Sequence, residues 1–261
     1  AILNTRNVES ADGMKELVDL AVSHFGDLHI VVPNAGVTSW APLGKGTIED
    51  WHREVDINLS GTFYLTHWAA AYWQQQGPAP GRALVFISSP AGTCPIPQIA
   101  AYNATKAAVQ ALMMTAAEDL APLGVRANAI SPIARTPMSM RNPELAELVK
   151  ETAGFDRNDP ANVAPVLGYL ISDRCRFTGQ VFGVEGDTIS LYNTWDIRKE
   201  ISNGGRRWTL EDLGSALADE PVQQQVRAMS PGGTVEHKLP SDDALAAFQA
   251  KSGAAAHADA S

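Results

Sequence analysis

The chain has 261 residues, of which 45% are apolar, so it can bury a full core and is most simply one domain with appendages. Its formal net charge of -9 disfavours nucleic acid or an anionic membrane surface as the main partner. We find no signal peptide and no apolar run of about 18 residues, so we expect a cytoplasmic protein that does not span a membrane. The two cysteines, Cys94 and Cys175, have no metal-ligand spacing, which predicts that no metal is bound.

The first part of the chain predicts two helices separated by a buried strand. Residues 12–25 repeat apolar side chains at helical spacing, and residues 28–32 are apolar except for His29, as in a strand buried on both faces of a parallel sheet. Thr47, followed by Asp50, predicts the N-cap of the second helix. The apolar residues expected to face the core are Met14, Leu17, Val18, Ala21 and Phe25 in the first helix, and Trp51, Val55, Ile57, Leu59, Phe63, Leu65 and Trp68 in the second.

Short strands and helices alternate through the rest of the chain. The strands are expected at residues 83–87, 125–130, 178–184 and 189–192. Helices are expected around Tyr102, after the Asp159-Pro160 N-cap, and within residues 208–213.

The tail after Pro221 is polar and rich in Ala and Gly, which favours disorder. The whole pattern predicts an α/β fold whose domain covers residues 1–188, with an extension over residues 189–220 and a mostly disordered tail over residues 221–261.

Candidate catalytic side chains follow the strand expected at residues 83–87. Ser88 and Ser89 stand at its carboxyl end, the edge where open α/β sheets place their ligands. Tyr102 and Lys106 are one helical turn apart, so both project from the same side of the next helix. A neighbouring ammonium favours the phenolate form of tyrosine, which otherwise ionises at about pH 10. Taken alone, the Tyr102 and Lys106 pair is weak evidence for a catalytic site. An exposed lysine beside a half-buried tyrosine on an ordinary helix gives the same spacing.

Five segments, in order, together resemble the short-chain dehydrogenase/reductase family. They are residues 27–36 (DLHIVVPNAG), Asn58-Leu59-Ser60-Gly61, Ser89, Tyr102-x-x-x-Lys106 and Asn128-Ala129-Ile130-Ser131-Pro132. The resemblance implies a Rossmann-type doubly wound parallel sheet. It also implies an oxidoreductase that transfers a hydride between NAD or NADP and a secondary alcohol or ketone.

The resemblance also implies a role for each matching residue. Tyr102 would exchange a proton with the substrate, Lys106 would lower the pKa of Tyr102 and bind the nicotinamide ribose, and Ser89 would polarise the substrate oxygen. Asn58 would hold a water for proton relay, although a buried amide is also common as a satisfied structural residue. The residues expected to bind the cofactor are Asn34, Ala35, Gly36, Tyr102, Lys106, Pro132 and Thr136. The Asn34-Ala35-Gly36 turn is equally compatible with an ordinary loop.

The segment after Pro132 differs from the usual family pattern. Ile133 stands where the family commonly has glycine, which weakens the assignment of Thr136. Arg135 is expected to be solvated or to face the substrate. Residues 138–158 are expected to form a substrate lid, and their apolar members suggest a partly apolar substrate.

The beginning of the chain also departs from the family. The family starts with a strand, a T-G-x-x-x-G-x-G turn and a helix whose amino end receives the cofactor pyrophosphate, and residues 1–261 contain no such turn. Residues 1–8 look like the tail of the third strand, so the first βαβα portion of the sheet is expected to be absent. The chain is then either a fragment of a longer protein or a catalytically inactive, dehydrogenase-like subunit with an assembly role.

Two further resemblances concern substrate and assembly. Residues 159–165 and the extension are similar to the subgroup related to the dehydrogenase part of multifunctional β-oxidation enzymes, which favours NAD and a hydroxyacyl thioester or another hydrophobic alcohol. His67, Trp68, Tyr72 and Trp73 lie on a helix that forms the subunit interface in the family, so a homo-dimer or homo-tetramer is expected.

Overall fold

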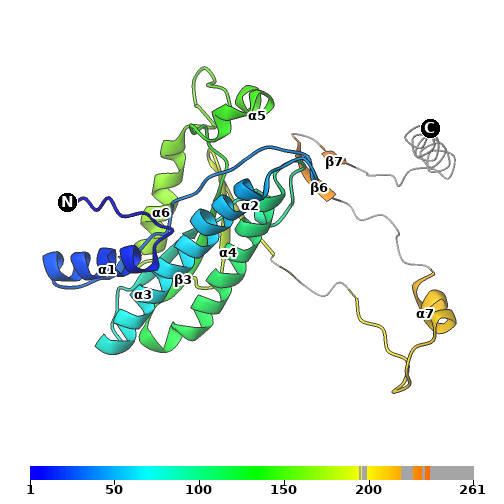
Figure 1. Cartoon of the computed structure of the whole chain (residues 1–261), viewed down its shortest axis with the longest axis horizontal. Coiled ribbons are helices and arrows are strands. Elements are labelled where there is room, and N and C mark those ends of the chain that lie inside the picture. The colour runs from blue at the N-terminus through cyan, green and yellow to red at the C-terminus, as the bar shows by residue number, and fades with distance from the viewer. Residues whose placement is uncertain (194, 196–198, 219–225, 231–232, 236–261) are drawn as a thin grey trace, which may run out of the picture. The chain divides into compact units, whose positions relative to one another are not determined.

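The computed structural model describes residues 1–193, 195, 199–218, 226–230 and 233–235 (Figure 1). The chain divides into two compact units, Ala1–Ile197 and Arg198–Ser261. The second unit contains α7 (Leu210–Leu217), a helix predicted there and N-capped by Thr209, and the antiparallel strands β6 (Val226–Ser230) and β7 (Gly233–Val235). The first unit contains the sheet and all the residues assigned to the site.

A five-stranded sheet, in the order β1-β2-β3-β4-β5, forms the centre of the first unit. Its parallel strands are β1 (Ile30–Val31), β2 (Ala83–Ile87), β3 (Arg126–Pro132) and β4 (Val181–Glu185), and β5 (Thr188–Leu191) runs antiparallel to β4. The predicted α/β class is therefore confirmed. Because β1 to β4 are parallel, their carboxyl ends meet at one edge of the sheet, where ligands of such folds bind.

Helices connect and cover these strands. The α-helices of the first unit are α1 (Ala11–Phe25), α2 (Ile48–Glu54), α3 (Gly61–Gln76), α4 (Ala100–Asp119), α5 (Pro143–Leu148) and α6 (Ala164–Ile171). A π-helical turn (Val55–Ser60) joins α2 to α3, and short 3-10 turns lie at Pro90–Gly92, Ala121–Leu123, Ser139–Arg141 and Pro160–Val163. The predicted caps Thr47 and Asp159 both accept backbone N–H groups, although Asp159 starts the 3-10 turn that precedes α6.

Apolar clusters lie on both faces of the sheet, as expected for β2. On one face Leu84 and Phe86 pack against Trp73 of α3 and against α4. On the other face Val85 packs against Leu170 of α6. All five side chains are at most 1% exposed. Successive β2 residues thus alternate between the face covered by α4 and the face covered by α6. These two helices lie on opposite sides of the sheet (Figure 1).

The predicted strand at residues 1–8 is wrong, because this segment has no regular structure. Asparagine side chains bind its backbone instead: Arg6 N–H donates to Asn4 Oδ1 at 2.8 Å, and Asn7 accepts the N–H of Glu9 in the same way at 3.2 Å. Local bonds of this kind compete with strand pairing. Among the described residues, no strand pairs with the outer side of β1.

The strand expected at residues 28–32 is accordingly short and only partly buried. It is reduced to β1, in which Val31 is buried but Ile30 is 40% exposed. The preceding helix α1 buries Met14 and Val18 as predicted, whereas Phe25 at its end is exposed. Burial on both faces was wrong here because β1 lies at the edge of the described sheet.

The helix that follows Thr47 buries a polar stripe in addition to part of the predicted apolar one. Glu54, Asn58, Thr62 and Thr66, spaced by four positions, are buried. Of the predicted apolar residues, Leu59 and Leu65 pack partly buried against the core, whereas Trp51 and Phe63 are 44% and 46% exposed. The threonines tolerate burial because their hydroxyls donate to carbonyls one turn back, Thr62 to Asn58 O and Thr66 to Thr62 O, both at 2.8 Å. The π-helical turn around Asn58 is a feature often found at functional sites.

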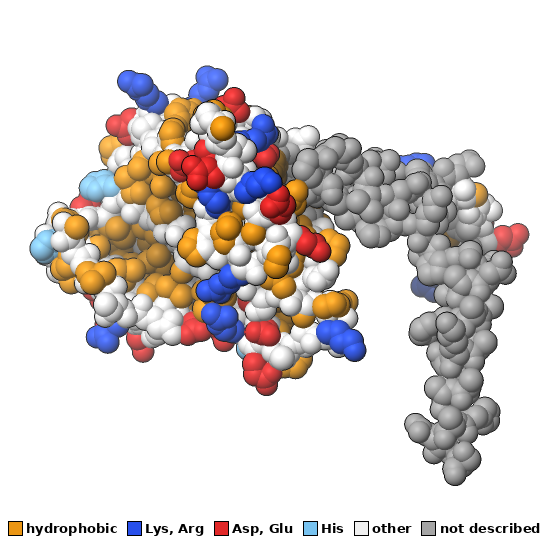
Figure 2. Space-filling view, turned by 90° about the horizontal axis from the view of Figure 1, so that it is seen from above, with side chains coloured by type: hydrophobic (Ala, Val, Ile, Leu, Met, Phe, Trp, Pro, Cys, Tyr) orange, Lys and Arg blue, Asp and Glu red, His pale blue; other side chains and the backbone are white. Residues whose placement is uncertain are grey.

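Charges of both signs are spread over the surface of the described part. On the face seen in Figure 2, acidic and basic side chains of the described part are interspersed, and hydrophobic side chains gather toward one end. None of the helices in the described ranges is long and apolar enough to cross a membrane. The predicted disorder of residues 221–261 falls mainly on residues outside the described part; within it, Val226 pairs with Val235 in β6 and β7.

Candidate active site

Two adjacent serines at the end of β2 have different contacts. Ser88 ties β2 to α4, because its hydroxyl donates to Lys106 O at 3.1 Å and accepts from Gln110 Nε2 at 2.9 Å. Ser89 caps the following 3-10 turn, where its Oγ accepts the N–H of Ala91 at 3.2 Å. The Ser89 hydroxyl also interacts with the Tyr102 phenol. The fold therefore directs Ser89 rather than Ser88 toward Tyr102.

Tyr102 and Lys106 project from the first turns of α4 over the end of β2. Lys106 is 4% exposed, and its Nζ donates to Ile87 O at 2.8 Å. The same Nζ lies 5.5 Å from the centre of the Tyr102 ring. Because Ile87 directly precedes the two serines, the hydroxyl of Ser89, the phenol and the ammonium meet in one small region.

Burial has the largest effect on the pKa of both Tyr102 and Lys106. It raises the pKa of Tyr102, the Ser89 hydroxyl opposes this rise, and the charge of Glu54 adds to it. Burial also lowers the pKa of Lys106 to about 8. In this structure the ammonium is directed at Ile87 O and desolvation of the phenol is the largest effect, so the pKa of Tyr102 is raised and not lowered.

Asn58 holds two segments together through both ends of its amide. Its Oδ1 accepts Val37 N–H at 2.8 Å, and its Nδ2 donates to Val37 O at 2.9 Å and to Thr105 Oγ1 at 3.2 Å. The residue is 0% exposed. This clamp fixes the segment after the Asn34-Ala35-Gly36 turn against α4, next to Lys106. The side chain thus has the satisfied contacts of a structural residue while standing beside the candidate site.

Gly36 occupies a narrow space between Asn58 and Lys106. A Cβ at this position would lie 3.5 Å from Asn58 Oδ1 and 3.6 Å from Lys106 Nζ. An ammonium has three donors, and the bond to Ile87 O uses one of them. The remaining donors of the ammonium suit hydrogen bonds to the hydroxyls of a ribose, the role that the family resemblance implied for Lys106.

The turn before Gly36 borders a pocket of about 220 Å³ at the end of β1. Asn34 and Ala35 line it together with Val32 and Pro33, which follow β1, and with apolar residues of α1 and α3. Both residues are exposed, which distinguishes them from the buried Asn58. The resemblance assigned this turn to the adenosine side of a dinucleotide.

Pro132 and Thr136 follow the neighbouring strand. Pro132 is the last residue of β3, which places it at the same sheet edge as Ser89. Thr136 N–H donates to Ser139 Oγ at 2.8 Å, so the chain turns sharply after this strand.

Arg135 has a structural contact that the sequence did not predict. Its guanidinium makes a two-pronged ion pair with Asp156, and its Nη1 donates to Val149 O at 3.3 Å. Arg135 is therefore not a free solvated charge, as one reading of the sequence expected, but is paired with Asp156. The arginine instead fastens residues 149–156, within the expected lid, to the end of β3.

Glu54 is a buried residue of this region that the sequence analysis missed. It is 1% exposed, its Oε1 accepts Ser39 N–H at 2.6 Å, and its Oε2 is buried without a partner in the described part of the chain. Burial raises the pKa of Glu54, and the bonds from Ser39 oppose this rise. The sequence feature that could have identified Glu54 is its position one turn before Asn58, on the same side of the helix.

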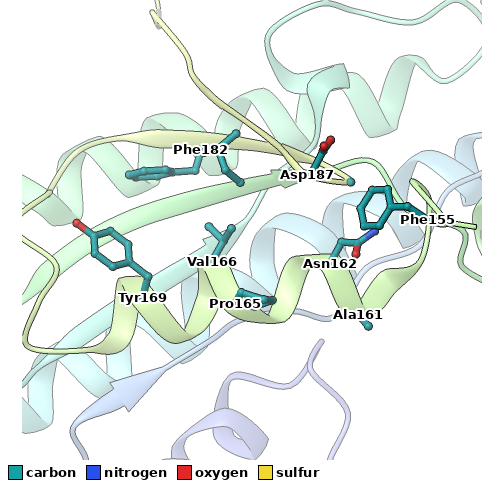
Figure 3. A pocket seen from close by; sticks show the side chains of 10 residues that line it. Phe155, Ala161, Asn162, Pro165, Val166, Tyr169, Phe182 and Asp187 are labelled. Carbon is teal, nitrogen blue, oxygen red and sulfur yellow. The ribbon is translucent and has the colours of Figure 1, made fainter.

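A larger pocket of about 560 Å³ lies between α6 and the β4–β5 hairpin (Figure 3). Its walls include Phe155, Asn162, Tyr169, Phe182 and Asp187 but none of the residues assigned to the site. Phe182 belongs to the apolar cluster on the α6 face of the sheet, whereas α4 covers the opposite face. No group of three His, Cys, Asp or Glu side chains within the described ranges could hold a metal ion.

Comparison with known proteins agrees with this geometry. Residues 3–186 match the family model described as enoyl-(acyl carrier protein) reductase. A 3-oxoacyl-[acyl-carrier-protein] reductase of Thermotoga maritima is 34% identical, over 70% of this chain and 75% of the relative. A cyclohexanol dehydrogenase of Acinetobacter sp. is 35% identical, over 71% and 74%. A hydroxyacyl-CoA dehydrogenase of Mycobacterium tuberculosis is 37% identical, over 78% and 66%.

A solved structure supports the same assignment. The short chain dehydrogenase from Mycobacterium avium matches with a TM-score of 0.71 and 33% identity, covering 82% of this chain and 70% of that one. The chain therefore belongs to the short-chain dehydrogenase/reductase family. The relatives named here are oxidoreductases, and the family resemblance drawn from the five sequence segments is confirmed.

Proposed function

We propose that the chain carries the proton-transfer site of an enzyme that moves a hydride between a nicotinamide cofactor and a secondary alcohol or its ketone. The observation that supports this most strongly is the meeting of Ser89, Tyr102 and Lys106 at the end of β2, with Lys106 Nζ 5.5 Å from the Tyr102 ring centre. A hydroxyl and a phenol that can bond one substrate oxygen, with a cation nearby, suit proton transfer at a carbonyl group.

Each of these residues has a distinct role in the proposal. In ketone reduction the Tyr102 O–H gives its proton to the substrate oxygen, and in alcohol oxidation Tyr102 takes the proton back. Ser89 donates a hydrogen bond to the same oxygen and stabilises the negative charge that develops there. Lys106, whose pKa is lowered to about 8, can return a proton to Tyr102 through a water held beside Asn58.

The cofactor supplies the hydride when it is bound. The residues proposed to hold it are Asn34, Ala35, Gly36, Tyr102, Lys106, Pro132 and Thr136. Lys106 and Gly36 would receive the nicotinamide ribose, and the pocket at Asn34 and Ala35 would receive the adenosine side. We favour NAD over NADP because of the similarity to the β-oxidation subgroup.

The proposed substrate is a 3-hydroxyacyl thioester or another hydrophobic secondary alcohol, together with the matching ketone. The relatives are named for 3-oxoacyl, hydroxyacyl and cyclohexanol compounds, which share an oxygen function on a hydrocarbon skeleton. Within the expected lid, Met140, Leu148 and Phe155 are 48%, 55% and 59% exposed, and such side chains suit contact with an apolar substrate.

We also propose a homo-dimer or homo-tetramer in the cytoplasm. Phe63 on α3 is 46% exposed and stacks on His67 with ring centres 5.8 Å apart. Exposed aromatic side chains on a helix suit contact with a second copy of the chain.

A substrate panel in the full-length protein tests the proposed function. A 3-oxoacyl thioester and cyclohexanone are each mixed with reduced NAD or reduced NADP, and loss of the reduced-cofactor absorbance is followed. We expect ketone-dependent oxidation of the cofactor. A folded protein that binds dinucleotide but turns over no ketone would instead favour the inactive, dehydrogenase-like subunit.

A further inference from the structure

Gln110 lies on the same stripe of α4 as two residues of the proposed site. It follows Lys106 by about one turn, as Lys106 follows Tyr102, so the three side chains project from the same side of the helix. Gln110 is 1% exposed. A buried amide needs partners for its two N–H donors and its oxygen. These partners lie on either side of Ser89.

The Gln110 amide binds the chain before and after Ser89. Its Nε2 donates to Ser88 Oγ at 2.9 Å and to Thr93 Oγ1 at 3.0 Å, and its Oε1 accepts the Thr93 hydroxyl at 3.2 Å. The Ser88 hydroxyl in turn donates to Lys106 O at 3.1 Å. Both ends of the segment that carries Ser89 are thereby fastened to α4.

The segment between these two anchors is a tight turn. Within it, Gly92 N–H donates to Ser89 O and Thr93 N–H donates to Pro90 O, both at 3.0 Å. The turn also lies directly against the Gln110 amide, because a Cβ at Gly92 would be 2.8 Å from Gln110 Nε2. Ser89 therefore has little freedom to move relative to α4 while Gln110 holds the ends of its turn.

Resting on the function proposed above, we propose that Gln110 is a positioning residue, which holds the Ser89 hydroxyl at the Tyr102 phenol by tying both ends of the Ser89 turn to α4. The two groups have to reach the same substrate oxygen, although Ser89 follows β2 and Tyr102 belongs to α4. A displacement of about 1 Å between such groups costs up to about 100-fold in rate. Gln110 thus acts on the reaction through Ser89 and not by touching the substrate.

The carbon-13 resonance of the Tyr102 ring carbon that bears the hydroxyl tests this without any turnover. It responds to hydrogen bonds at the phenol oxygen, and its loss in Tyr102→Phe assigns it in the 261-residue chain. Ser89→Ala should shift it, because the Ser89 hydroxyl interacts with the phenol. Gln110→Met, which keeps the length of the side chain but has no amide, should shift it in the same direction. In the Ser89→Ala background, Gln110→Met should add no further shift.

Met113→Ala is the control for a purely structural effect. Met113 belongs to the apolar core packed against the same helix and is 0% exposed, so its truncation should destabilise the chain. It should leave the Tyr102 resonance in place. An unmoved resonance in folded Ser89→Ala or Gln110→Met overturns the proposal. A Gln110→Met shift of equal size with and without Ser89 overturns it too, as does an equal shift in Met113→Ala.

Thr93→Val covers the case in which Gln110→Met does not fold. It keeps the shape of the side chain but removes the hydroxyl that Gln110 binds. It should reproduce the expected shift of the Tyr102 resonance. The same substitution at Thr66, whose buried hydroxyl donates to Thr62 O, should not. An unmoved resonance in folded Thr93→Val would overturn the proposal.

A rate measurement in the full-length protein separates this proposal from the proposed function. Gln110→Met should lower the single-turnover rate of ketone reduction by about 10- to 100-fold, with the affinity for reduced cofactor unchanged. In the Ser89→Ala background the same substitution should cost less than about 2-fold, and an equal loss in both backgrounds overturns the proposal. A parent protein that reduces no ketone would contradict the proposed function, while the Tyr102 resonance still decides the role of Gln110.

Discussion

Burial has a larger effect on the candidate site than any neighbouring charge, and Lys106 shows this most clearly. Its amine is 4% exposed and makes its bond to a backbone carbonyl, Ile87 O, so the charged form loses its hydration without gaining a counter-charge. The pKa of Lys106 is therefore lowered from 10.5 to about 8. A lysine of this kind can exchange protons near neutral pH, which an exposed lysine cannot do.

The lowered pKa makes stability depend on pH in a defined direction. Between pH 8 and 10.5 the unfolded chain holds the Lys106 proton more tightly than the folded chain, so stability rises with pH across this window. We expect the free energy of unfolding of the parent, relative to Lys106→Met, to rise by about 2–3 kcal/mol from about pH 7 to pH 10. Urea unfolding of both proteins at the two pH values measures this change in the difference between their unfolding free energies.

The same substitution at the exposed Lys45 serves as the control for this prediction. The difference between the parent and Lys45→Met should stay constant over the same pH range. A constant difference for Lys106→Met as well would mean that Lys106 is not desolvated in the folded chain.

At the scale of elements, the site depends on how closely the 3-10 turn after Ser89 approaches α4. Gly92 ends this turn, and a Cβ there would lie 2.7 Å from the backbone carbon and oxygen of Lys106. It would also lie 2.8 Å from Gln110 Nε2. Only glycine allows this approach, which keeps Ser89 and the Tyr102 turn of α4 together.

Gly92→Ala should therefore destabilise the chain by about 1–3 kcal/mol, because the helix backbone has to move. Gly168→Ala is the matched control: it lies within α6, and a Cβ there meets nothing within 4 Å. Alanine at that position should stabilise the helix by up to about 1 kcal/mol. Chemical denaturation of the two variants compares them directly, and equal effects would contradict the close approach at Gly92.

Elements were predicted best where an apolar run is both continuous and buried. Residues 83–87 form β2 as predicted, because a central parallel strand needs apolar side chains on both faces. The same reasoning from apolar residues failed in part for the helix after Thr47. Its buried face contains threonines that satisfy their own hydroxyls within the helix, a possibility that apolar periodicity does not detect.

The sequence predicted the proximity of some residues of the candidate site and missed others. Ser89, Tyr102 and Lys106 could be placed together because strand ends and helical spacing determine where they project. Glu54 and the Arg135–Asp156 pair could not be found in this way, because both depend on which loops pack over the helix ends. Local sequence does not specify such packing.

At the scale of the whole molecule, the described sheet has an edge at β1, and residues 1–8 do not extend it. The 261 residues contain no glycine-rich turn to bind a pyrophosphate at a helix amino end. The contacts proposed for the cofactor thus do not include a helix amino end for its pyrophosphate. We expect this chain by itself to bind reduced dinucleotide weakly.

Fluorescence titration of the 261-residue chain with reduced NAD measures this affinity. Binding should be weaker than micromolar, because the phosphate anchor contributes much of the affinity in such folds. A dissociation constant in the micromolar range or lower would contradict the expectation and show that the remaining contacts suffice.

The most direct test of the central claim is the rate of hydride transfer in Tyr102→Phe, measured as a single turnover in the full-length protein at saturating cofactor. The control is Tyr169→Phe, on the opposite face of the sheet, which should keep the parent rate. We expect Tyr102→Phe to lose about 10²- to 10⁴-fold in rate with its fold and dinucleotide affinity intact. A rate close to that of the parent would contradict the assignment of Tyr102 as the proton-transfer residue.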